Sequence, residues 1–413
     1  MPLEPLGILT LLGVTIVLGY VGSLIFKKTR VPDVVWLLLF GLLVGPIFGF
    51  VNREAFITAS PLLGAIALLI ILFDAGLHMN IYQIMKKISR SIIIAFLGIL
   101  LSTIGVALLS TLLFNFDITR ALILGVIVGG TSSAVVISIV DPLLIKDGIK
   151  TTLKLESIIT DPVIIVLAIA LMQIAVATAQ PTMLFSSLVN MYSVAIVIGF
   201  IIGIVWLVIL DKIKGKGFDY MLTLAIAFLL YVLVESIGGS GSISALVFGL
   251  VLGNSIVLSR MLRFEKRYRV DHLLKEFQAE IAFFIRSFFF VYLGLIATIN
   301  FTYVYYGILI TLVIIVMRFV VVELGTYKMA ITKIEKNVMT SMIPRGLAAA
   351  VLAQLPLSLG IEGGEIFLNI SFVVILLTVL ATTILTRICY KPEVEAPKEI
   401  KLIKQPPAKR KTK

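Results

Sequence analysis

Two carboxylates stand five residues apart in the stretch LESIITDPVIIVLAIALM, which covers residues 155–172 and is apolar enough to lie in a membrane. A carboxylate near the centre of a bilayer costs roughly 2.5–3.5 kcal/mol on insertion scales, so acids at this depth are usually functional. Glu156 and Asp161 are therefore the first candidates for chemistry. An acid without a fixed partner can be neutralised by a proton or by a cation, and a group that takes both in turn can exchange one for the other.

Oxygen-bearing groups surround Asp161 in the sequence. In a helix, Ser157 lies four residues before it on the same face, and Thr160 lies on the neighbouring face. Pro162 donates no backbone hydrogen bond, which leaves the carbonyl of Ile158 without its usual partner. Such hard oxygen ligands suit an alkali cation. With two histidines and one cysteine, the chain offers no ligand cluster for a transition metal, and we expect no cofactor.

Two further stretches combine glycine with small or hydroxyl residues at membrane depth. They are VGGTSSAVV at residues 128–136 and MIPRGLAAAVLAQLP at residues 342–356. Unwound backbone inside a membrane is tolerated only where protein buries it or where it lines a cavity. We therefore expect a broken helix at each stretch. Carbonyls near Thr131 would be free to bind a cation there, where the partial charges of half-helix ends also meet.

Glu156 needs a partner, because a buried charge is costly unless it is paired and hydrogen-bonded. Arg318, in the middle of TLVIIVMRFVVVEL, is placed to supply that partner, and we predict a structural ion pair between the two. Arg345, on the second glycine-containing stretch, has two interpretations. Either it supplies positive charge to the site when no cation is bound, or it lies at a helix end and extends to water.

The whole chain has the composition of a membrane protein. Of its 413 residues, 60% are hydrophobic and only 14% are charged, compared with about 25% charged residues in ordinary globular proteins. About 20 apolar residues cross the hydrocarbon core as a helix. Thirteen stretches qualify, near residues 5–26, 33–50, 57–78, 90–114, 120–140, 155–178, 185–210, 219–237, 241–258, 279–299, 302–328, 341–359 and 366–389.

Loop charges orient these segments. Nearly all loop lysines and arginines lie after the odd-numbered segments and in the tail from Arg387, whereas the alternate connections hold only Arg53 and Arg120. Because basic loops stay in the cytoplasm, we expect a protein of the cell membrane with its N-terminus outside and its C-terminus in the cytoplasm. The net charge of +12 then reflects topology and contact with membrane lipid, and we expect no nucleic-acid partner.

Similar motifs recur in the two halves of the chain. FGLLVGP at residues 40–46 matches FGLVLGN at residues 248–254, and Gly76 matches Gly294. The spacing between the matching motifs pairs segments one to six with segments eight to thirteen. The two sets then have opposite orientations in the membrane. Many secondary transporters are built from such inverted repeats, with the site at the repeat interface near the bilayer midplane.

The fold class that follows is an all-α polytopic membrane protein. A transmembrane antiporter domain is expected at residues 1–389, and a basic cytoplasmic tail at residues 390–413 is expected to be disordered. Within the domain, repeat one covers about 5–178, a linker helix about 185–210 and repeat two about 219–389.

These stretches together resemble the monovalent cation/proton antiporter superfamily, in its NhaP-like branch, over roughly residues 5–389. LESIITDP resembles the family's sixth-helix signature, which usually reads E-S-x-x-N-D-P, and GGTSSAVV resembles its unwound fifth helix. VPDVVWLLLFGLLVGP, GGSGSISALVFGLVLGN and IPRGLAAAVLA complete the pattern. The resemblance implies 13 helices in two inverted six-helix repeats, with crossed broken helices 5 and 12, a mobile core of helices 4–6 and 11–13, and a homodimer.

The resemblance also implies roles for single residues. The family's ion-binding aspartate falls on Asp161, its serine ligand on Ser157 and its backbone-carbonyl threonine on Thr131, which together would bind Na+. Its structural glutamate–arginine pair falls on Glu156 and Arg318.

Two positions depart from the family's pattern. Ser132 stands where the fifth-helix break often holds an acid, and Thr160 stands where the family usually has Asn, or Asp in electrogenic members. With one titrating carboxylate left, we expect electroneutral one-for-one exchange of Na+, and also Li+, for H+ by alternating access, in a transporter and not an enzyme. A less acidic, hydroxyl-lined site equally suits K+.

Functions from other classes fit less well. A sodium-coupled organic-solute symporter could use a similar inverted-repeat fold, but it would need a larger substrate cavity than this small hydroxyl-and-carboxylate cluster suggests. A single pivotal carboxylate indicates stoichiometric exchange and not a passive channel. An intramembrane protease would need paired catalytic aspartates or a Ser–His pair in the core. Asp141 and Asp161 both precede proline, but Asp141 falls at the cytoplasmic end of its segment.

Overall fold

The computed structural model describes residues 13–22, 24–25, 31–50, 53–79, 88–176, 181–213, 218–264, 268, 270–298 and 300–390. Beyond Tyr390, the expected tail lies outside the described residues, as does the start of the first segment. All regular structure in the described part is helical. Eight described helices are long and apolar enough to cross a membrane, or nine when one bent pair counts as a span.

The helices follow the predicted segments, and each of the thirteen segments contains helix in the described part. The first half consists of an apolar helix Gly13–Gly22, α2 (Asp33–Leu42) with a π-helical turn η1 (Leu43–Ile47), α3 (Arg53–His78), α5 (Ile88–Phe114), α6 (Ile118–Ile127), α7 (Ser133–Val140) and α8 (Asp147–Val176). The remainder consists of α9 (Pro181–Ile213), α10 (Asp219–Ser236), α11 (Gly241–Gly253), α12 (Ser255–Met261), α13 (His272–Ile296), α14 (Phe301–Gly325), α15 (Lys333–Ser341), α16 (Leu347–Ser358) and α17 (Gly364–Cys389).

Side chains of the local sequence explain where several helices begin. The first backbone N–H groups of a helix have no partner within it, so a polar side chain just before the helix stabilises its start. At α15, Thr332 and Glu335 form a reciprocal capping box. Single capping side chains accept from the first turns of α6, α11, α13 and α14; they are Asp117, Ser240, Asp271 and Asn300.

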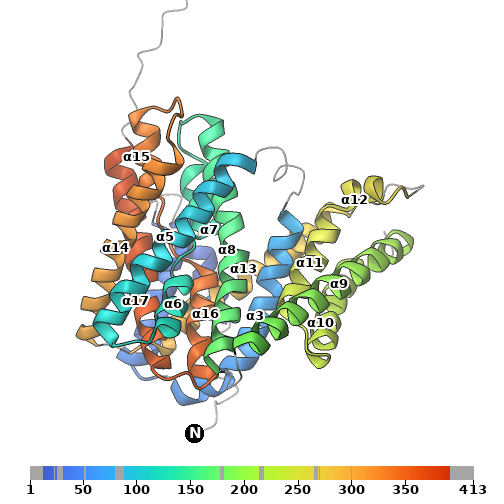
Figure 1. Cartoon of the computed structure of the whole chain (residues 1–413), viewed down its shortest axis with the longest axis horizontal. Helices are drawn as coiled ribbons and strands as arrows, with labels where there is room; N and C mark the ends of the chain where they lie inside the picture. Colours follow the sequence, from blue (N-terminus) through green and yellow to red (C-terminus); the bar gives the residue numbers. More distant parts are fainter. Residues whose placement is uncertain are drawn as a thin grey trace, which may run out of the picture.

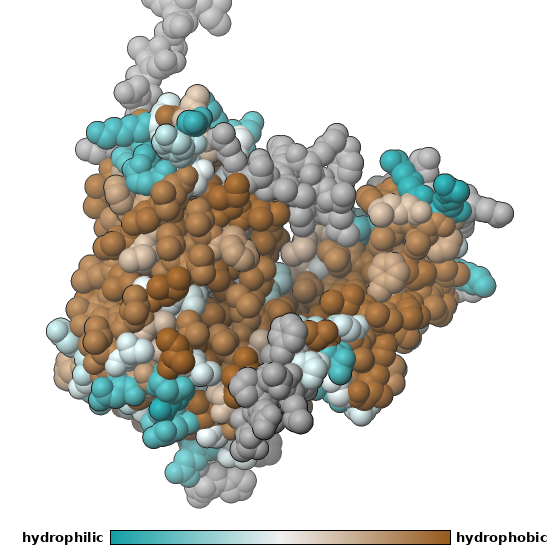
Figure 2. Space-filling view, viewed as in Figure 1, coloured by the Kyte–Doolittle hydropathy of each residue, from teal (hydrophilic) through white to brown (hydrophobic). Residues whose placement is uncertain are grey.

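A broad apolar band surrounds the molecule between two polar ends, as Figure 2 shows for one face. Large hydrophobic side chains on several helices are exposed in this band, including Phe96, Leu112, Ile201, Leu229 and Leu312. So large an exposed apolar surface is unfavourable in water and marks contact with a membrane. The protein is therefore a multi-pass membrane protein.

The helices form two bundles (Figure 1). In the first, which we call the core bundle, α5–α8 pack with α14–α17. In the second, the scaffold bundle, α2 and α3 pack with α9–α13. The bundles meet where α16 of the core contacts α3 and α13 of the scaffold. One hydrophobic cluster fills the scaffold between α3, α9, α10 and α11, while a larger one runs from the core bundle onto α2, α3 and α13.

Glycines let scaffold helices touch backbone to backbone at two places. A Cβ on Gly41 of α2 or on Gly294 of α13 would collide with the backbone of the other helix. Gly76 of α3 and Gly249 of α11 repeat this arrangement. Gly41 matches Gly249 in the repeated motif, and Gly76 matches Gly294, so the second contact is the first one with the halves exchanged. This exchange supports the two inverted repeats; their boundaries stay a prediction.

The ninth predicted segment differs from the structure, because residues 241–258 do not form one straight helix. α11 ends at Gly253, and α12 leaves it at an angle of 80°. At the bend, Asn254 donates its Nδ2 to the carbonyls of Leu250 at 2.9 Å and Met79 at 2.8 Å. A side chain that satisfies helix-end carbonyls in this way allows the helix to stop there.

Candidate functional site

The fifth and twelfth segments are each broken, and their breaks touch inside the core bundle. Residues 128–132 separate α6 from α7, and residues 342–346 separate α15 from α16. The backbone N–H of Ser132 donates to the carbonyl of Pro344 at 2.8 Å. Gly346 has to be a glycine there, because a Cβ would collide with the side chain of Ser132. Two helix N-termini and two C-termini thus meet, and they bring partial charges of both signs to one place.

Asp161, on α8, faces the first break. Its Oδ2 accepts hydrogen bonds from the hydroxyl of Ser133 at 2.8 Å and from the backbone N–H of Ser133 at 3.3 Å. Because Ser133 is the first residue of α7, the carboxylate lies at the positive end of that helix. The side chain is partly exposed, and Ser133 is its hydrogen-bond partner; no basic residue of the described part pairs with it.

Thr160 holds α8 against the first break. Its Oγ1 accepts from the backbone N–H of Thr131 at 3.2 Å and lies 3.1 Å from the carbonyl oxygen of Thr131, to which it can donate. The two hydroxyls are 3.3 Å apart. The Thr160 hydroxyl has one proton and also lies 3.0 Å from the carbonyl of Ser157. It can therefore donate either to that carbonyl or to the Thr131 carbonyl, which the sequence predicts to be free.

Ser157 lies one turn from Asp161 on α8 and is fully buried. Its hydroxyl donates to the carbonyl of Lys154 at 3.0 Å, and no described contact joins it to Asp161. The structure thus brings Thr160 against Thr131 and places Ser132 at the helix crossing. Ser157 lies on the face of α8 that carries Asp161, but it does not touch that carboxylate.

The residue that does touch Asp161, Ser133, was missed by the sequence analysis. Two serines follow Thr131, and the sequence pattern favours the first of them, Ser132, for the site position. Only the start of α7 decides between them: Ser132 precedes the helix and bonds to the other break, while Ser133 begins the helix and faces α8. The hydroxyl-rich run before an apolar helix was the available signal.

Glu156 and Arg318 form a bidentate ion pair. Nη1 of Arg318 donates to Oε1, and Nη2 donates to Oε2 at 3.0 Å. The arginine Nε donates to the carbonyl of Met339, near the end of α15, at 3.0 Å. Glu156 and Arg318 are 2% and 4% exposed. Charge-assisted bonds of this geometry satisfy both groups and join α8 to α14 and α15.

Arg345 lies in the second break and is 2% exposed, so it does not extend to water. Its Nη1 is 3.4 Å from the carbonyl of Ile343, and its Nε has no hydrogen-bond partner among the described residues. Glu156 and Arg318 both act on it electrostatically. The guanidinium therefore contributes a positive charge inside the core bundle beside a pair that is already neutral.

A cavity of about 230 Å³ lies between the bundles. Its core wall comes from α7, starting at Ala134, the residue after Ser133. Its scaffold wall includes Asp33 at the start of α2 and Arg286 on α13. A space of this size has room for several water molecules, each occupying roughly 30 Å³. Its lining includes Ala134, the residue that follows the serine bonded to Asp161.

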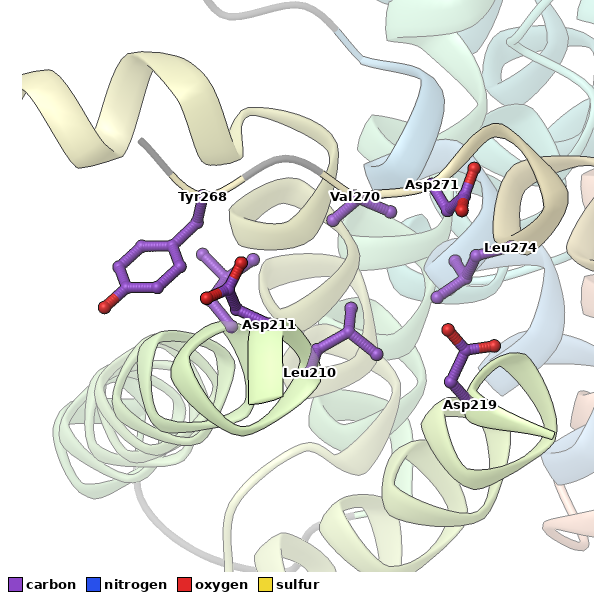
Figure 3. Close-up of a pocket in the computed structure, with 8 residues that line it drawn as sticks. Leu210, Asp211, Asp219, Tyr268, Val270, Asp271 and Leu274 are labelled. Atoms are coloured by element: carbon purple, nitrogen blue, oxygen red, sulfur yellow. The ribbon is translucent and has the colours of Figure 1, made fainter. Parts of the chain in front are cut away.

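A second cavity, of about 10 Å³, lies in the scaffold bundle. Figure 3 shows Asp211, Asp219 and Asp271 around it, together with Tyr268 and leucine side chains. In the described part of the chain, no group of three or more His, Cys, Asp or Glu side chains is arranged to hold a metal ion. This cavity has room for about one water molecule and is separate from the site at Asp161.

Comparison with known proteins identifies the family. The family model described as "Sodium/hydrogen exchanger, transmembrane" matches residues 13–391. A protein of Methanocaldococcus jannaschii named "Probable Na(+)/H(+) antiporter 2" is 30% identical over 291 residues, which are 67% of this chain and 66% of that protein. K(+)/H(+) antiporter NhaP2 of Shewanella baltica is 24% identical over 330 residues, 77% of this chain and 55% of that protein. The chain thus spans less than two thirds of the length of these curated relatives.

The fold is shared with a solved structure. The sodium proton antiporter MjNhaP1 from Methanocaldococcus jannaschii, in its structure at pH 8, superposes with a TM-score of 0.77 at 24% identity, covering 92% of this chain and all of that chain. The all-helical architecture and the family match over almost the whole described chain agree. The chain belongs to the sodium/hydrogen exchanger family.

Proposed function

We propose that this protein exchanges a monovalent cation, Na+ and also Li+, for a proton by alternating access. The observation that carries the proposal is Asp161: a partly exposed carboxylate in the membrane, bonded to Ser133 and without a basic partner in the described residues. A carboxylate in this position is neutralised either by a proton or by a cation. Competition between the two for one group, combined with access from each side in turn, gives exchange.

The access route is proposed from the packing of the two bundles. On the side of the basic connections, a cavity lies between α7, α2 and α13, and its lining includes Ala134, next to the serine that bonds to Asp161. On the opposite side, α16 packs against α3 and α13 and closes the seam. This arrangement supports a conformation open toward the basic side, which the charge pattern makes the cytoplasmic side.

The cation ligands are proposed from the oxygens around the first break. Asp161 provides the carboxylate, with Ser157 and the carbonyl of Thr131 as further ligands for Na+. Thr160 and Ser132 shape the pocket, since one bonds to Thr131 and the other to the second break. The Ser157 hydroxyl would have to turn away from its own helix backbone to bind the cation.

The stoichiometry follows from the charges. Glu156 and Arg318 neutralise each other, and we propose that the pair is structural. Asp161 is then the one acid that changes state, so one cation leaves as one proton binds, without net charge movement. Arg345, buried and sparsely bonded, balances the charge of Asp161 when no cation is bound.

Potassium is the second candidate cation. Serine, and not an acid, stands at position 132, which lowers the negative charge that would favour the more strongly hydrated Na+. A relative in Shewanella baltica is named a K(+)/H(+) antiporter. Both observations support K+/H+ exchange at the same site.

Proton movement in proteoliposomes tests these proposals. Na+, Li+ and K+ are added in turn to vesicles that hold a proton gradient, with the membrane potential clamped. We expect Na+ and Li+ to collapse the gradient, whereas a response to K+ alone would select the second candidate. A measurable current under a balanced pair of gradients would reject one-for-one exchange, and the absence of any cation-driven proton movement would reject antiport.

Orientation, assembly and lipid contact are further proposals. The distribution of Lys and Arg supports an outside N-terminus and a cytoplasmic C-terminus. Apolar side chains exposed on α9 and α10 fit either lipid or a second copy of the chain, and the family resemblance supports a homodimer. Cross-linking in native membranes and accessibility of tags at each terminus test these points.

A further inference from the structure

Gln354, on α16, is a buried amide whose oxygen and nitrogen both lack a hydrogen-bond partner among the described residues. Gln354 is 1% exposed. Native structures leave few such groups unpaired, because the polar atoms lose water and gain nothing in return. An unpaired amide at this depth therefore calls for an explanation in another state of the protein.

Gln354 lies on the same stripe of α16 as Gly346, which is part of the helix crossing. Gly346, Ala350, Gln354 and Ser358 follow one another at four-residue spacing, so they lie along one winding stripe of α16. The stripe starts at the second break, beside Ser132, and leads away from the basic side. With a rise of 1.5 Å per residue, Gln354 lies about 12 Å along the helix from Gly346.

At the seam between the two bundles, α16 packs against α3 of the scaffold bundle. A Cβ on Gly64 of α3 would lie 3.0 Å from Nε2 of Gln354, so the amide packs directly against backbone there. One turn before Gly64, the hydroxyl of Ser60 bonds to the hydroxyl of Tyr292 from α13. Tyr292 donates in turn to the carbonyl of Phe56 at 3.0 Å. The amide of Gln354 thus packs against α3 one turn from a pair of buried hydroxyls, those of Ser60 and Tyr292.

We propose that Gln354 is a cation ligand on the half of the path that opens away from the basic side. When the core bundle opens that seam, the amide oxygen replaces part of the hydration shell of an alkali cation moving to or from Asp161. In the conformation described here the seam is closed, which leaves the amide unpaired. This inference rests on the proposed exchange and adds a ligand outside the helix crossing.

Exchange kinetics measured separately from each side test the proposal. The full-length chain is assayed in sealed membrane vesicles of both orientations, with Na+ as the probe and Gln354→Leu as the variant. Gln278→Leu is the matched control. Gln278 is also 1% exposed, its Nε2 has no partner in the described part of the chain, and it lies on α13 of the scaffold bundle.

Gln354→Leu should raise the half-saturating Na+ concentration on the side away from the basic loops by about tenfold, which corresponds to about 1.4 kcal/mol. On the basic side the value should stay within about twofold, a change of less than about 0.5 kcal/mol. The unfolding temperature should not fall, because leucine removes an unpaired polar group. Gln278→Leu should leave both sides unchanged. Equal shifts on both sides, or none, would overturn the proposal.

A second variant keeps the proposal testable if Gln354→Leu does not fold. The sequence has a single cysteine, Cys389, so Gln354→Cys in a Cys389→Ser background carries one thiol. A membrane-impermeant thiol reagent applied away from the basic side should label it during turnover. Labelling only from the basic side, or none during turnover, would contradict the inference.

The two levels of failure are distinct. Wild-type protein that moves no protons with any cation defeats the proposed function. Wild-type exchange combined with unaltered kinetics in Gln354→Leu defeats only the role of Gln354.

Discussion

Glu156 and Asp161 are two acids on the same membrane helix, and their surroundings are opposite. Glu156 is 2% exposed and accepts hydrogen bonds from two guanidinium nitrogens of Arg318. Asp161 is partly exposed and accepts hydrogen bonds from the hydroxyl and the backbone N–H of Ser133. The first acid has its charge neutralised permanently by an arginine; the second has donors that favour a negative charge without cancelling it. Fixed partners, and not depth in the membrane, separate a structural acid from one that can carry cargo.

The arginines differ in the same way. Arg318 uses Nε, Nη1 and Nη2 in hydrogen bonds, whereas Arg345 has one long contact to a backbone carbonyl. The core bundle thus holds one neutral pair, an acid without a basic partner among the described residues, Asp161, and a sparsely bonded arginine, Arg345. We therefore expect the Glu156–Arg318 pair to contribute to stability, and Asp161 and Arg345 to act in transport.

The largest effect is expected for Asp161→Asn. Asparagine keeps the size of the side chain but cannot take up a proton or balance a cation. Exchange in proteoliposomes should fall by on the order of a hundredfold or more, as for removal of a positioned proton-transfer group. Folded yield and unfolding temperature should stay close to wild type, because Asp161 has no ion pair to lose. Wild-type exchange by this variant would disprove the site.

Glu156→Gln should act on stability. It leaves Arg318 buried without a counter-charge, and breaking a buried pair in this way costs about 3–5 kcal/mol. The yield of monodisperse protein in detergent should drop sharply. A normal yield with abolished exchange would reverse the roles of the two acids.

The double variant Glu156→Gln with Arg318→Met separates charge from packing. Removing both charges of a buried pair is often nearly neutral for stability. Most of the yield lost in the single variant should therefore return. If yield stays low, the pair contributes geometry that apolar side chains cannot replace, such as the bond to Met339.

Ser133→Ala should weaken cation binding without abolishing exchange. A hydrogen bond to a charged group contributes about 1.5–3 kcal/mol, so the half-saturating Na+ concentration at fixed pH should rise by roughly tenfold or more. Ser110→Ala is the control, because that buried hydroxyl bonds only to its own helix at Val106. A shift of equal size in both variants would show a general packing effect.

Glu335, at the edge of the membrane on α15, extends the comparison to a third acid with a structural role. Its backbone-side partners are the N–H groups of Thr332 at 2.8 Å and Lys146 at 3.3 Å. Burial acts to raise the pKa of Glu335, but hydrogen bonds from Thr332 and Lys146 outweigh it and hold the pKa below 4.5. A lowered folded-state pKa means that this stabilisation is present above pH 4.5 and is lost as the pH falls through the folded-state value.

The smallest effect is therefore expected for Glu335→Gln. At neutral pH the loss should be about 1 kcal/mol, the usual contribution of a helix cap. Unfolding temperatures of wild type and variant are compared at neutral pH and below pH 4. The difference should shrink in acid; a constant difference would show that the carboxylate charge is not involved.

Much of the fold followed from the sequence, because membrane helices and their breaks depend on local composition. Apolar runs predicted the spans, and glycine beside hydroxyl residues predicted the two breaks, both of which are confirmed. The bend at Asn254 was not predictable, since it depends on a carbonyl of a distant helix at Met79. The choice of Ser133 over Ser132 also required the structure, because it depends on the residue at which α7 begins. So did the orientation of the Ser157 hydroxyl toward its own helix, because a side-chain rotation decides it.

At Gly41, Gly76, Gly249 and Gly294 the scaffold helices touch backbone to backbone, with no side chain between them at these contacts. When bilayer thickness changes, membrane helices respond by tilting or sliding against their neighbours. Here the scaffold resists both, so the adjustment falls on the seam between the bundles. Lipid chain length should consequently raise or lower the turnover rate. The preference of the pocket for one cation over another should stay the same.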